Sequence, residues 1–228
     1  MKAGVFHVPY MKPERSSRAT FEYSIQCAIE ADQAGFVDFM VGEHATQAWE
    51  SIPNPEVVIG AAALQTQSIR FAPMAHLLPL HFPGSLAIQT GWLSQVLEGR
   101  YFLGVGAGAY GRDAMLRGQP DDLSEAHPRM EEALTILKRI WRREPFEYKG
   151  TFYDASFPDE HAIGVPGVDA QEGGDVHTMS NFMPWDGPDG PEIAVTGLSL
   201  NSGSLRWAGA NGFQPISFFG GSALLKSH

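Results

Sequence analysis

The stretch EADQAGFVDFMVGEH, residues 30–44, contains the pattern from which the fold can be predicted. Its first residues end a segment with apolar positions at helical spacing, and Gly35 is a typical residue just after a helix. The apolar run that follows is typical of a buried strand. It ends abruptly in two titratable side chains, Glu43 and His44. The stretch therefore predicts a helix, then a buried strand, with a carboxylate and an imidazole where the strand ends.

The same alternation of helices and apolar strands continues on both sides of this stretch. Strands that are continuously apolar indicate a parallel sheet covered by helices. Two architectures fit, an open doubly wound sheet and a (β/α)8 barrel, and in both the functional side chains gather at the carboxyl ends of strands. The expected strands are residues 2–9, 36–43, 69–79, 100–108, 191–199 and 213–221, and the expected helices are residues 18–35, 54–67, 83–99, 124–142 and 202–212.

Composition excludes some classes of partner. Of the 228 residues 43% are hydrophobic, which is enough for a sizeable core, and the net charge is −10 without a Lys/Arg cluster. Nucleic acids and anionic membranes bind a basic face, so neither is expected as a partner. The single cysteine, Cys27, fits a reducing compartment. No signal peptide or membrane-spanning segment is visible. We therefore expect a cytoplasmic protein, and we expect no metal site.

Two segments at expected strand ends invite comparison with phosphate-binding motifs. The glycine run LGVGAGAYG, residues 103–111, has the dinucleotide-binding spacing only from Gly106, and no helix is expected before Ser124. Glycines that permit close backbone approach are the simpler interpretation. A second segment, rich in serine, lies between a strand and a helix. It could bind a phosphate through the helix N-terminus or serve only as a helix cap. Its residues are Ser199, Asn201, Ser202, Gly203 and Ser204.

Several motifs together resemble the bacterial luciferase-like flavin monooxygenases, and the resemblance covers nearly all of residues 1–228. They are GEH after the second strand, FAPMAHLLPLHFP in the third, LSQVLEGRYFLGVGAGAY around the fourth, and GLSLNSGSLRWAGANG near the end. The resemblance implies a (β/α)8 barrel that binds reduced flavin at the carboxyl ends of its strands. It also implies reaction with O2, oxygenation of an organic substrate, and reduced FMN supplied by a separate NAD(P)H-dependent reductase.

The resemblance also assigns roles to individual residues. His44 matches the catalytic histidine, which acts in acid–base chemistry beside the flavin, and Glu43 matches a carboxylate behind it. Met74 and Ala75 match a bulge that packs against the flavin ring, where many relatives have a non-prolyl cis peptide. Some relatives bind the phosphate with an arginine at the position of Ala107, so Arg112 or the serine-rich helix start would have to replace it. The remaining cofactor-binding residues implied are Ala107, Gly108, Ala109, Ser199, Ser202, Gly203 and Ser204.

The chain supplies about six β/α units, so a single barrel domain of residues 1–228 is expected to be incomplete, with the C-terminal units missing. Residues 157–191 are rich in Gly, Pro and Asp and have no period, which is typical of a long functional loop, such as a lid. Three functions remain open: a monooxygenase acting on an apolar substrate, a shortened flavin-binding protein without turnover, and an oxidoreductase dependent on the deazaflavin F420. A homodimer through helices 54–67 and 83–99 is also expected.

Overall fold

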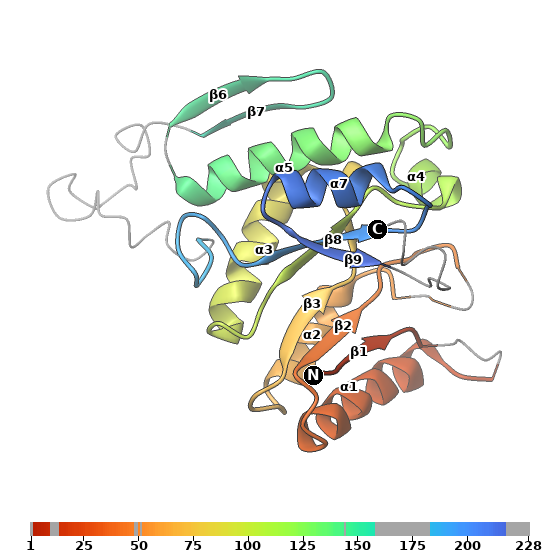
Figure 1. Ribbon diagram of the computed structural model, residues 1–228. Coiled ribbons are helices and arrows are strands. Elements are labelled where there is room, and N and C mark those ends of the chain that lie inside the picture. Colours follow the sequence, from red (N-terminus) through yellow and green to blue (C-terminus); the bar gives the residue numbers. More distant parts are fainter. Residues whose placement is uncertain are drawn as a thin grey trace, which may run out of the picture.

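The central strands of the protein run parallel to one another, as Figure 1 shows. The computed structural model describes residues 2–9, 14–47, 50, 52–143, 145–157 and 183–217. Within these ranges, both central sheets contain only parallel pairings. One sheet contains, in spatial order, β1 (Gly4–His7), β2 (Asp38–Val41) and β3 (Arg70–Pro73). The other contains β4 (His76–Leu77), β5 (Leu103–Gly106), β8 (Ile193–Gly197) and β9 (Gln214–Ser217).

The two sheets meet at β3. Phe71 in β3 forms an isolated parallel bridge with Tyr101, just before β5. Only Met74 and Ala75 separate β3 from β4, and the peptide bond between them is cis, in agreement with the resemblance. The strand expected over residues 69–79 is therefore interrupted, because its first part pairs with β2 and its second part pairs with β5.

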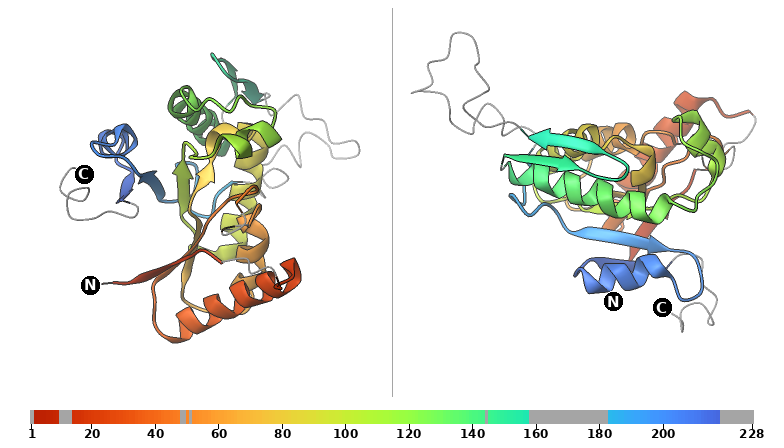
Figure 2. Two further views of the ribbon diagram at one scale, coloured as in Figure 1. Left: turned by 90° about the vertical axis from the view of Figure 1, so that its right-hand side faces the viewer. Right: turned by 90° about the horizontal axis from the view of Figure 1, so that it is seen from above.

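Helices follow the strands and cover them on the outside (Figure 2). Consecutive helices α1, α2, α3 and α5 pack against one another, and α7 packs against β8 and β9. The core between helices and strands contains fully buried Phe39, Phe71 and Trp141. The indole Nε1 of Trp141 donates to Ala87 O at 3.0 Å, which ties α5 to α3. The helices are α1 (Ser17–Gln33), α2 (Pro55–Ala63), α3 (Pro83–Leu97), α4 (Gly111–Leu116), α5 (Ala126–Arg142) and α7 (Gly203–Ala210), with a short 3₁₀ helix η1 (Leu78–Leu80).

The second helix ends earlier than the sequence predicts. It was expected over residues 54–67, but α2 ends at Ala63, and the predicted N-cap Asn54 makes no side-chain capping bond. The reason is the carboxylate of Asp32 at the end of α1. It accepts hydrogen bonds from Gln67 N at 2.7 Å, from Ser68 N at 3.1 Å and from Ile69 N at 2.8 Å. Those backbone groups are thus used to hold the entry into β3 rather than to extend α2.

Replacing Asp32 by asparagine is expected to lower the free energy of unfolding at neutral pH by about 1 kcal/mol, because the variant loses a charged acceptor that is only partly buried. Burial alone would raise the pKa of Asp32, but hydrogen bonds from the backbone of Gln67 and the hydroxyl of Ser68 lower it to about 2. A depressed pKa stabilises the fold above the ordinary carboxyl pKa, and this stabilisation is lost as the pH falls towards 2.

Urea unfolding at neutral pH and near pH 3 measures this effect. The difference between wild type and Asp32→Asn should be smaller at the lower pH. Glu22→Gln, on the exposed face of the same helix, is the matched control and should change little at either pH. Equal stability of Asp32→Asn and wild type at neutral pH would contradict the role of this carboxylate.

One helix and one β-hairpin were not expected. The helix α4 begins at Gly111, directly after the glycine run, so the expectation that no helix begins before Ser124 was wrong. A helix of six residues is too short to show a full apolar period. The antiparallel hairpin of β6 (Phe146–Lys149) and β7 (Asp154–Phe157) packs outside α5. Its turn is held by the carboxylate of Glu132 on α5, which accepts from the backbone N–H groups of residues 151–153.

Most of the predicted lid, residues 158–182, lies outside the described residues, so the lid stays a prediction. The described end of that segment packs on the last turns of α3. Gln95 Nε2 donates to Met183 O at 2.7 Å, and Trp185 N donates to Ser94 Oγ at 3.0 Å. This end of the segment therefore lies towards the amino ends of the strands, ahead of β8.

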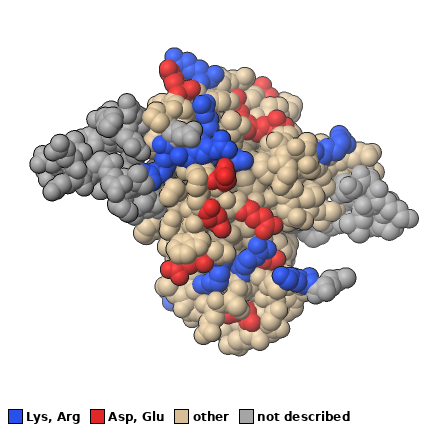
Figure 3. Space-filling view, turned by 60° about the vertical axis from the view of Figure 1, so that its left-hand side comes forward, with Lys and Arg blue, Asp and Glu red and all other residues tan. Residues whose placement is uncertain are grey.

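Two surface properties bear on partners. Among the described helices, none is long and apolar enough to cross a membrane. On the face shown in Figure 3, small groups of Lys and Arg side chains are interspersed with Asp and Glu.

Candidate active site

The carboxyl ends of β1, β2, β5 and β8 and the β3–β4 junction surround one cavity with a volume of about 320 Å³. This is the place where a parallel α/β fold is expected to bind a ligand. Apolar and small side chains form most of its wall. The cavity is lined by Phe6, His44, Glu50, Met74, Ala75, Leu77, Gly106, Ala107, Gly108, Ala109, Tyr110, Thr196, Gly197, Leu198, Ser199, Ser202 and Ser204.

The imidazole of His44 is held from behind by Asp113, which is fully buried in the first turn of α4. His44 Nδ1 lies 3.0 Å from Asp113 Oδ2, and the other carboxylate oxygen accepts from Thr46 N at 2.8 Å. Burial alone would raise the pKa of Asp113, but hydrogen bonds from Thr46 and His44 lower it. An ionised carboxylate can only accept, so Nδ1 carries the proton and donates. This leaves Nε2 as the nitrogen of His44 that can accept a proton.

A second carboxyl group, that of Glu50, lies on the other side of the same ring. Glu50 Oε2 is 3.5 Å from His44 Nε2, and both side chains line the cavity. Burial raises the pKa of Glu50, with the nearby charge of His44 acting in the opposite direction. The ring of Tyr110 lies edge-on to that of His44 at 5.0 Å between centroids. Asp113, His44 and Glu50 therefore form a line of groups along which a proton can move.

Glycines in β5 allow close packing beside the cavity. A Cβ on Gly104 would collide with Pro73 O, so this glycine lets β5 approach the β3–β4 junction. A Cβ on Gly106 would lie 3.0 Å from Thr196 Oγ1 and 3.4 Å from the Cβ of Ala75, inside the cavity wall. The glycine run therefore serves close backbone approach at a strand end, which is the interpretation favoured above.

The opposite end of the cavity lies at the start of α7. Ser202 is the N-cap of this helix, and its Oγ accepts from Leu205 N at 3.4 Å. Ser199, Ser202 and Ser204 line the cavity, whereas Gly203 is exposed and does not. Arg112 is exposed and is not among the lining residues either. Some relatives have an arginine where this chain has Ala107. Of the two groups that could replace that arginine, only the serine-rich helix start faces the cavity.

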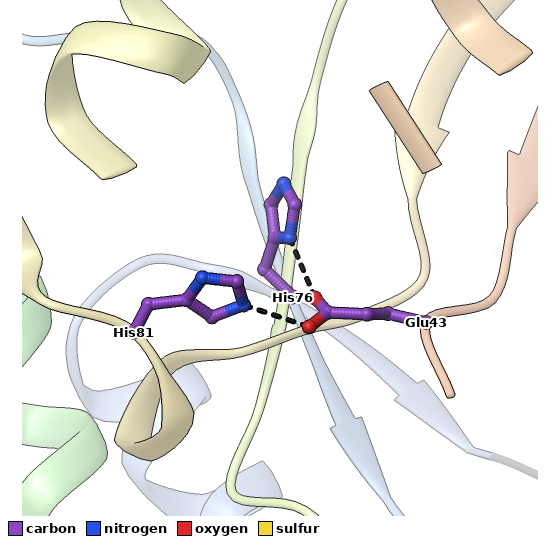
Figure 4. Close-up of side chains that lie close together, drawn as sticks. All are labelled: Glu43, His76 and His81. Atoms are coloured by element: carbon purple, nitrogen blue, oxygen red, sulfur yellow. Dashed lines mark hydrogen bonds and ion pairs between the residues drawn. The ribbon is translucent and has the colours of Figure 1, made fainter. Parts of the chain in front are cut away.

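Glu43 does not face the cavity, although it precedes His44 in the chain. Successive residues at a strand end point to opposite sides, and the side chain of Glu43 is 1% exposed on the far side. Its carboxylate lies 2.8 Å from His76 Nδ1 and 2.7 Å from His81 Nε2 (Figure 4). Potential ligand atoms of these three residues all lie within 4.8 Å of one another, so the group could hold a metal ion, which the sequence did not suggest.

Sequence reasoning missed Asp113, Glu50 and Tyr110. Asp113 lies 69 positions from its partner His44, on a helix too short to be predicted, so no local pattern marks it. Glu50 comes after the strand end and has no sequence motif around it. By contrast, His44 and the glycine loop lie directly at predicted strand ends, and Met74 and Ala75 were implied by the family resemblance.

The fold and the site define an α/β protein with parallel strands and an acid–base side chain facing a cavity at the strands' carboxyl ends. The family model described as luciferase-like monooxygenase matches residues 1–209, and the chain belongs to this family.

Individual relatives agree with the family. The chain is 52% identical over 228 residues to 2,5-diketocamphane 1,2-monooxygenase 2 of Pseudomonas putida, a match that covers 100% of this chain and 60% of the relative. It is 46% identical to 3,6-diketocamphane 1,6-monooxygenase of the same organism, covering 100% of the chain and 61% of that relative. The chain therefore spans about three fifths of the length of these relatives.

Solved structures give the same result. The oxygenating constituent of 3,6-diketocamphane monooxygenase from Pseudomonas putida, a type II Baeyer–Villiger monooxygenase in complex with FMN, superposes with a TM-score of 0.89. It is 48% identical, and the match covers 100% of this chain and 60% of that one. An F420-dependent secondary alcohol dehydrogenase superposes with a TM-score of 0.74 at 16% identity, a likeness of fold alone.

Proposed function

We propose that the protein is the oxygenating component of a flavin-dependent monooxygenase that uses reduced FMN and O2. One observation carries the proposal: His44, held by buried Asp113, faces an apolar cavity in a chain 48% identical to an FMN-bound relative. Its substrate is proposed to be an apolar cyclic ketone of the diketocamphane type, because relatives 46% to 52% identical are named for such compounds. A separate NAD(P)H-dependent reductase would supply the reduced FMN.

The described residues fit a flavin. Ala75 and Gly106 offer little side-chain bulk to the cavity that they line, which leaves room for a planar ring system. Ser202 and Ser204 offer hydroxyl groups at the N-terminus of α7, where backbone N–H groups attract a phosphate. When bound, reduced FMN supplies two electrons, so that one oxygen atom of O2 enters the substrate and the other leaves as water.

The side chains around the cavity supply the proton chemistry. Asp113 fixes the orientation of His44 and leaves its Nε2 free to give or take a proton at the reacting atoms. Glu50 lies close enough to exchange a proton with that nitrogen. Phe6 and Leu77 add apolar surface to the cavity, and apolar surroundings strengthen these interactions.

We further propose that the parallel strands of the described residues correspond to consecutive strands of a (β/α)8 barrel, with residues 1–228 belonging to one domain. The superposition of this chain on the FMN-bound relative, with a TM-score of 0.89, supports this correspondence. The F420 alternative is not favoured, because the F420-dependent likeness is at 16% identity and the FMN-bound one at 48%.

Oxygenation with ¹⁸O₂ tests the proposed function. The purified protein is given FMN, a flavin reductase with NADH, and a diketocamphane, and the product is examined by mass spectrometry. Incorporation of one ¹⁸O atom, dependent on FMN, is the expected result. Binding of FMN without product would instead favour a flavin-binding protein without turnover, and binding of F420 but not FMN would favour the deazaflavin alternative.

The protein is also proposed to form a homodimer through α2 and α3. Large apolar side chains are exposed on and directly after these helices: Leu64, the residue after α2, is 84% exposed and Trp92 in α3 is 53% exposed, which is unusual for a solvated face. Val57, Ile88 and Val96 are exposed on the same two helices. A two-fold interface would cover them.

Substituting Trp92→Arg is expected to convert the dimer into a monomer, because a buried charge at the centre of an apolar interface is costly. Light scattering at micromolar concentration measures the mass. Leu116→Arg, an exposed apolar residue on α4, is the control and should leave the dimer intact. A wild-type protein that is monomeric under these conditions would exclude the interface.

A further inference from the structure

A buried cluster of charged side chains lies on the side of Glu43 away from the cavity. Glu43 accepts from His76 and His81, and Arg117 Nη2 lies 3.0 Å from its Oε1. The other ring nitrogen of His76, Nε2, is 3.1 Å from Glu56 Oε1 in an ion pair that lacks good hydrogen-bond geometry. We call these five residues the Glu43 cluster. Figure 4 shows its centre, with Glu43 between the two imidazoles.

The cluster lies where backbone pairing changes partners. β2 pairs with β3 as far as Val41 and Pro73, and Met74 N still donates to Val41 O at 2.6 Å. Beyond this point β4 pairs with β5, and the described residues show no ladder between β2 and β4. The Glu43 carboxylate takes over as acceptor, from His76 Nδ1 at 2.8 Å and from Leu77 N at 3.4 Å. A side chain therefore joins the two strand ends where the backbone does not.

Charges in the Glu43 cluster balance without a metal ion. His76 is fully buried, and burial alone would lower its pKa, but hydrogen bonding to Glu43 and Glu56 raises that pKa to about 9. As an imidazolium it donates to Glu43 from Nδ1 and forms an ion pair with Glu56 through Nε2, and with Arg117 it offsets the two carboxylates. Burial alone would raise the pKa of Glu43, but hydrogen bonds from His76 and His81 hold it well below its usual range. Arg117 at this carboxylate disfavours a bound cation.

The two ends joined in this way carry the cavity wall. Ala75 and Leu77, on either side of His76, line the cavity, and so does His44, the residue after Glu43. We propose that His76 is a positioning residue, held between Glu43 and Glu56 to fix the Ala75–Leu77 wall and the strand end that bears His44. The part of this proposal that concerns flavin binding rests on the proposed function.

The flavin-free protein provides the first test. His76→Gln should speed amide hydrogen exchange in the segment around Ala75 and Leu77 by about tenfold, as expected when a local opening loses an ordering contact. His127→Gln, on α5 and paired with Glu131, is the matched control and should leave exchange there unchanged. Unchanged exchange in His76→Gln would overturn the positioning role, whether or not flavin binds.

The pH dependence of stability provides the second test. Because the folded-state pKa of His76 is raised, its stabilisation is complete below about pH 6.5 and is lost as the pH rises through about 9. The groups that face it are Glu43, Glu56 and His81, with Arg117 beyond Glu43 and Tyr101 near Glu56. As the pH rises from about 6.5 to about 9, the difference in unfolding free energy between wild type and His76→Gln should therefore become smaller. A difference independent of pH would contradict an imidazolium.

Two further measurements separate the cluster from its alternatives. FMN binding, followed by quenching of flavin fluorescence, should be about tenfold weaker in His76→Gln than in His127→Gln, because a shifted wall misplaces the ring. Normal FMN affinity would restrict His76 to a structural role and overturn the proposal. Tight binding of Zn²⁺ that is abolished by both Glu43→Gln and His81→Gln would also overturn it, in favour of a metal site. Failure of wild type to bind FMN would count against the proposed function, while hydrogen exchange still decides the role of His76.

Discussion

Replacing His44 by alanine is expected to lower the rate of coupled substrate oxygenation by about 100- to 10,000-fold, the usual effect of removing a positioned acid–base group. FMN binding should remain nearly normal, because the substitution leaves Ala75, Gly106 and the serine-rich end of the cavity in place. Oxygen would still be consumed, but hydrogen peroxide should replace the oxygenated product. The measurement is the ratio of product to peroxide at equal consumption of reduced FMN.

His127→Ala is the matched control for this experiment, since it removes a histidine from α5 outside the cavity lining. It should keep the wild-type ratio. If His44→Ala also kept normal coupled turnover, His44 would not be the acid–base residue, and the function proposed for this cavity would need another proton donor. Glu50 would then be the first candidate, because it lines the same cavity.

Replacing Asp113 by asparagine is expected to have the second largest effect, again a loss of about 100-fold or more in coupled oxygenation. The amide offers one acceptor and one donor group in place of a charged acceptor, so it no longer enforces the tautomer with the proton on His44 Nδ1. Asp113 also accepts a hydrogen bond from the backbone N–H of Thr46. Its replacement therefore also affects the loop that follows His44.

A double-variant experiment separates these two contributions. If Asp113 acts through His44, then Asp113→Asn combined with His44→Ala should be no slower than His44→Ala alone. If the rate losses of the two single variants multiply in the double variant, Asp113 serves the loop rather than the imidazole. Asp121→Asn, an exposed carboxylate in the loop after α4, is the control and should retain wild-type activity.

The pair of Glu43 and His44 shows how neighbours in the chain acquire separate tasks. Both were predicted to serve one site, because both lie at the end of a predicted strand. In the structure they point to opposite sides of that strand end, His44 into the cavity and Glu43 into a buried charged cluster. Alternation of side chains along a strand makes the separation unavoidable once the strand is placed between two layers.

The sequence by itself determined the order of strands and helices and the position of the site at the strand ends. These properties follow from local periods: apolar runs for buried strands, helical spacing for covering helices, and glycines at the turns. His44 and Gly108 could be recognised for this reason, since each lies where a predicted strand stops. The resemblance of the motifs added the family and its cofactor.

Tertiary structure alone decided the partners that complete the site. Asp113 reaches His44 from a short helix 69 positions away, Asp32 ends α2 by bonding backbone groups beyond it, and Glu43 joins β2 to β4 across a gap in the ladder. Each is a carboxylate whose position is set by chain closure rather than by a local period. Such contacts are stabilised by burial and by several donors at once, and neither exists until distant segments have packed together.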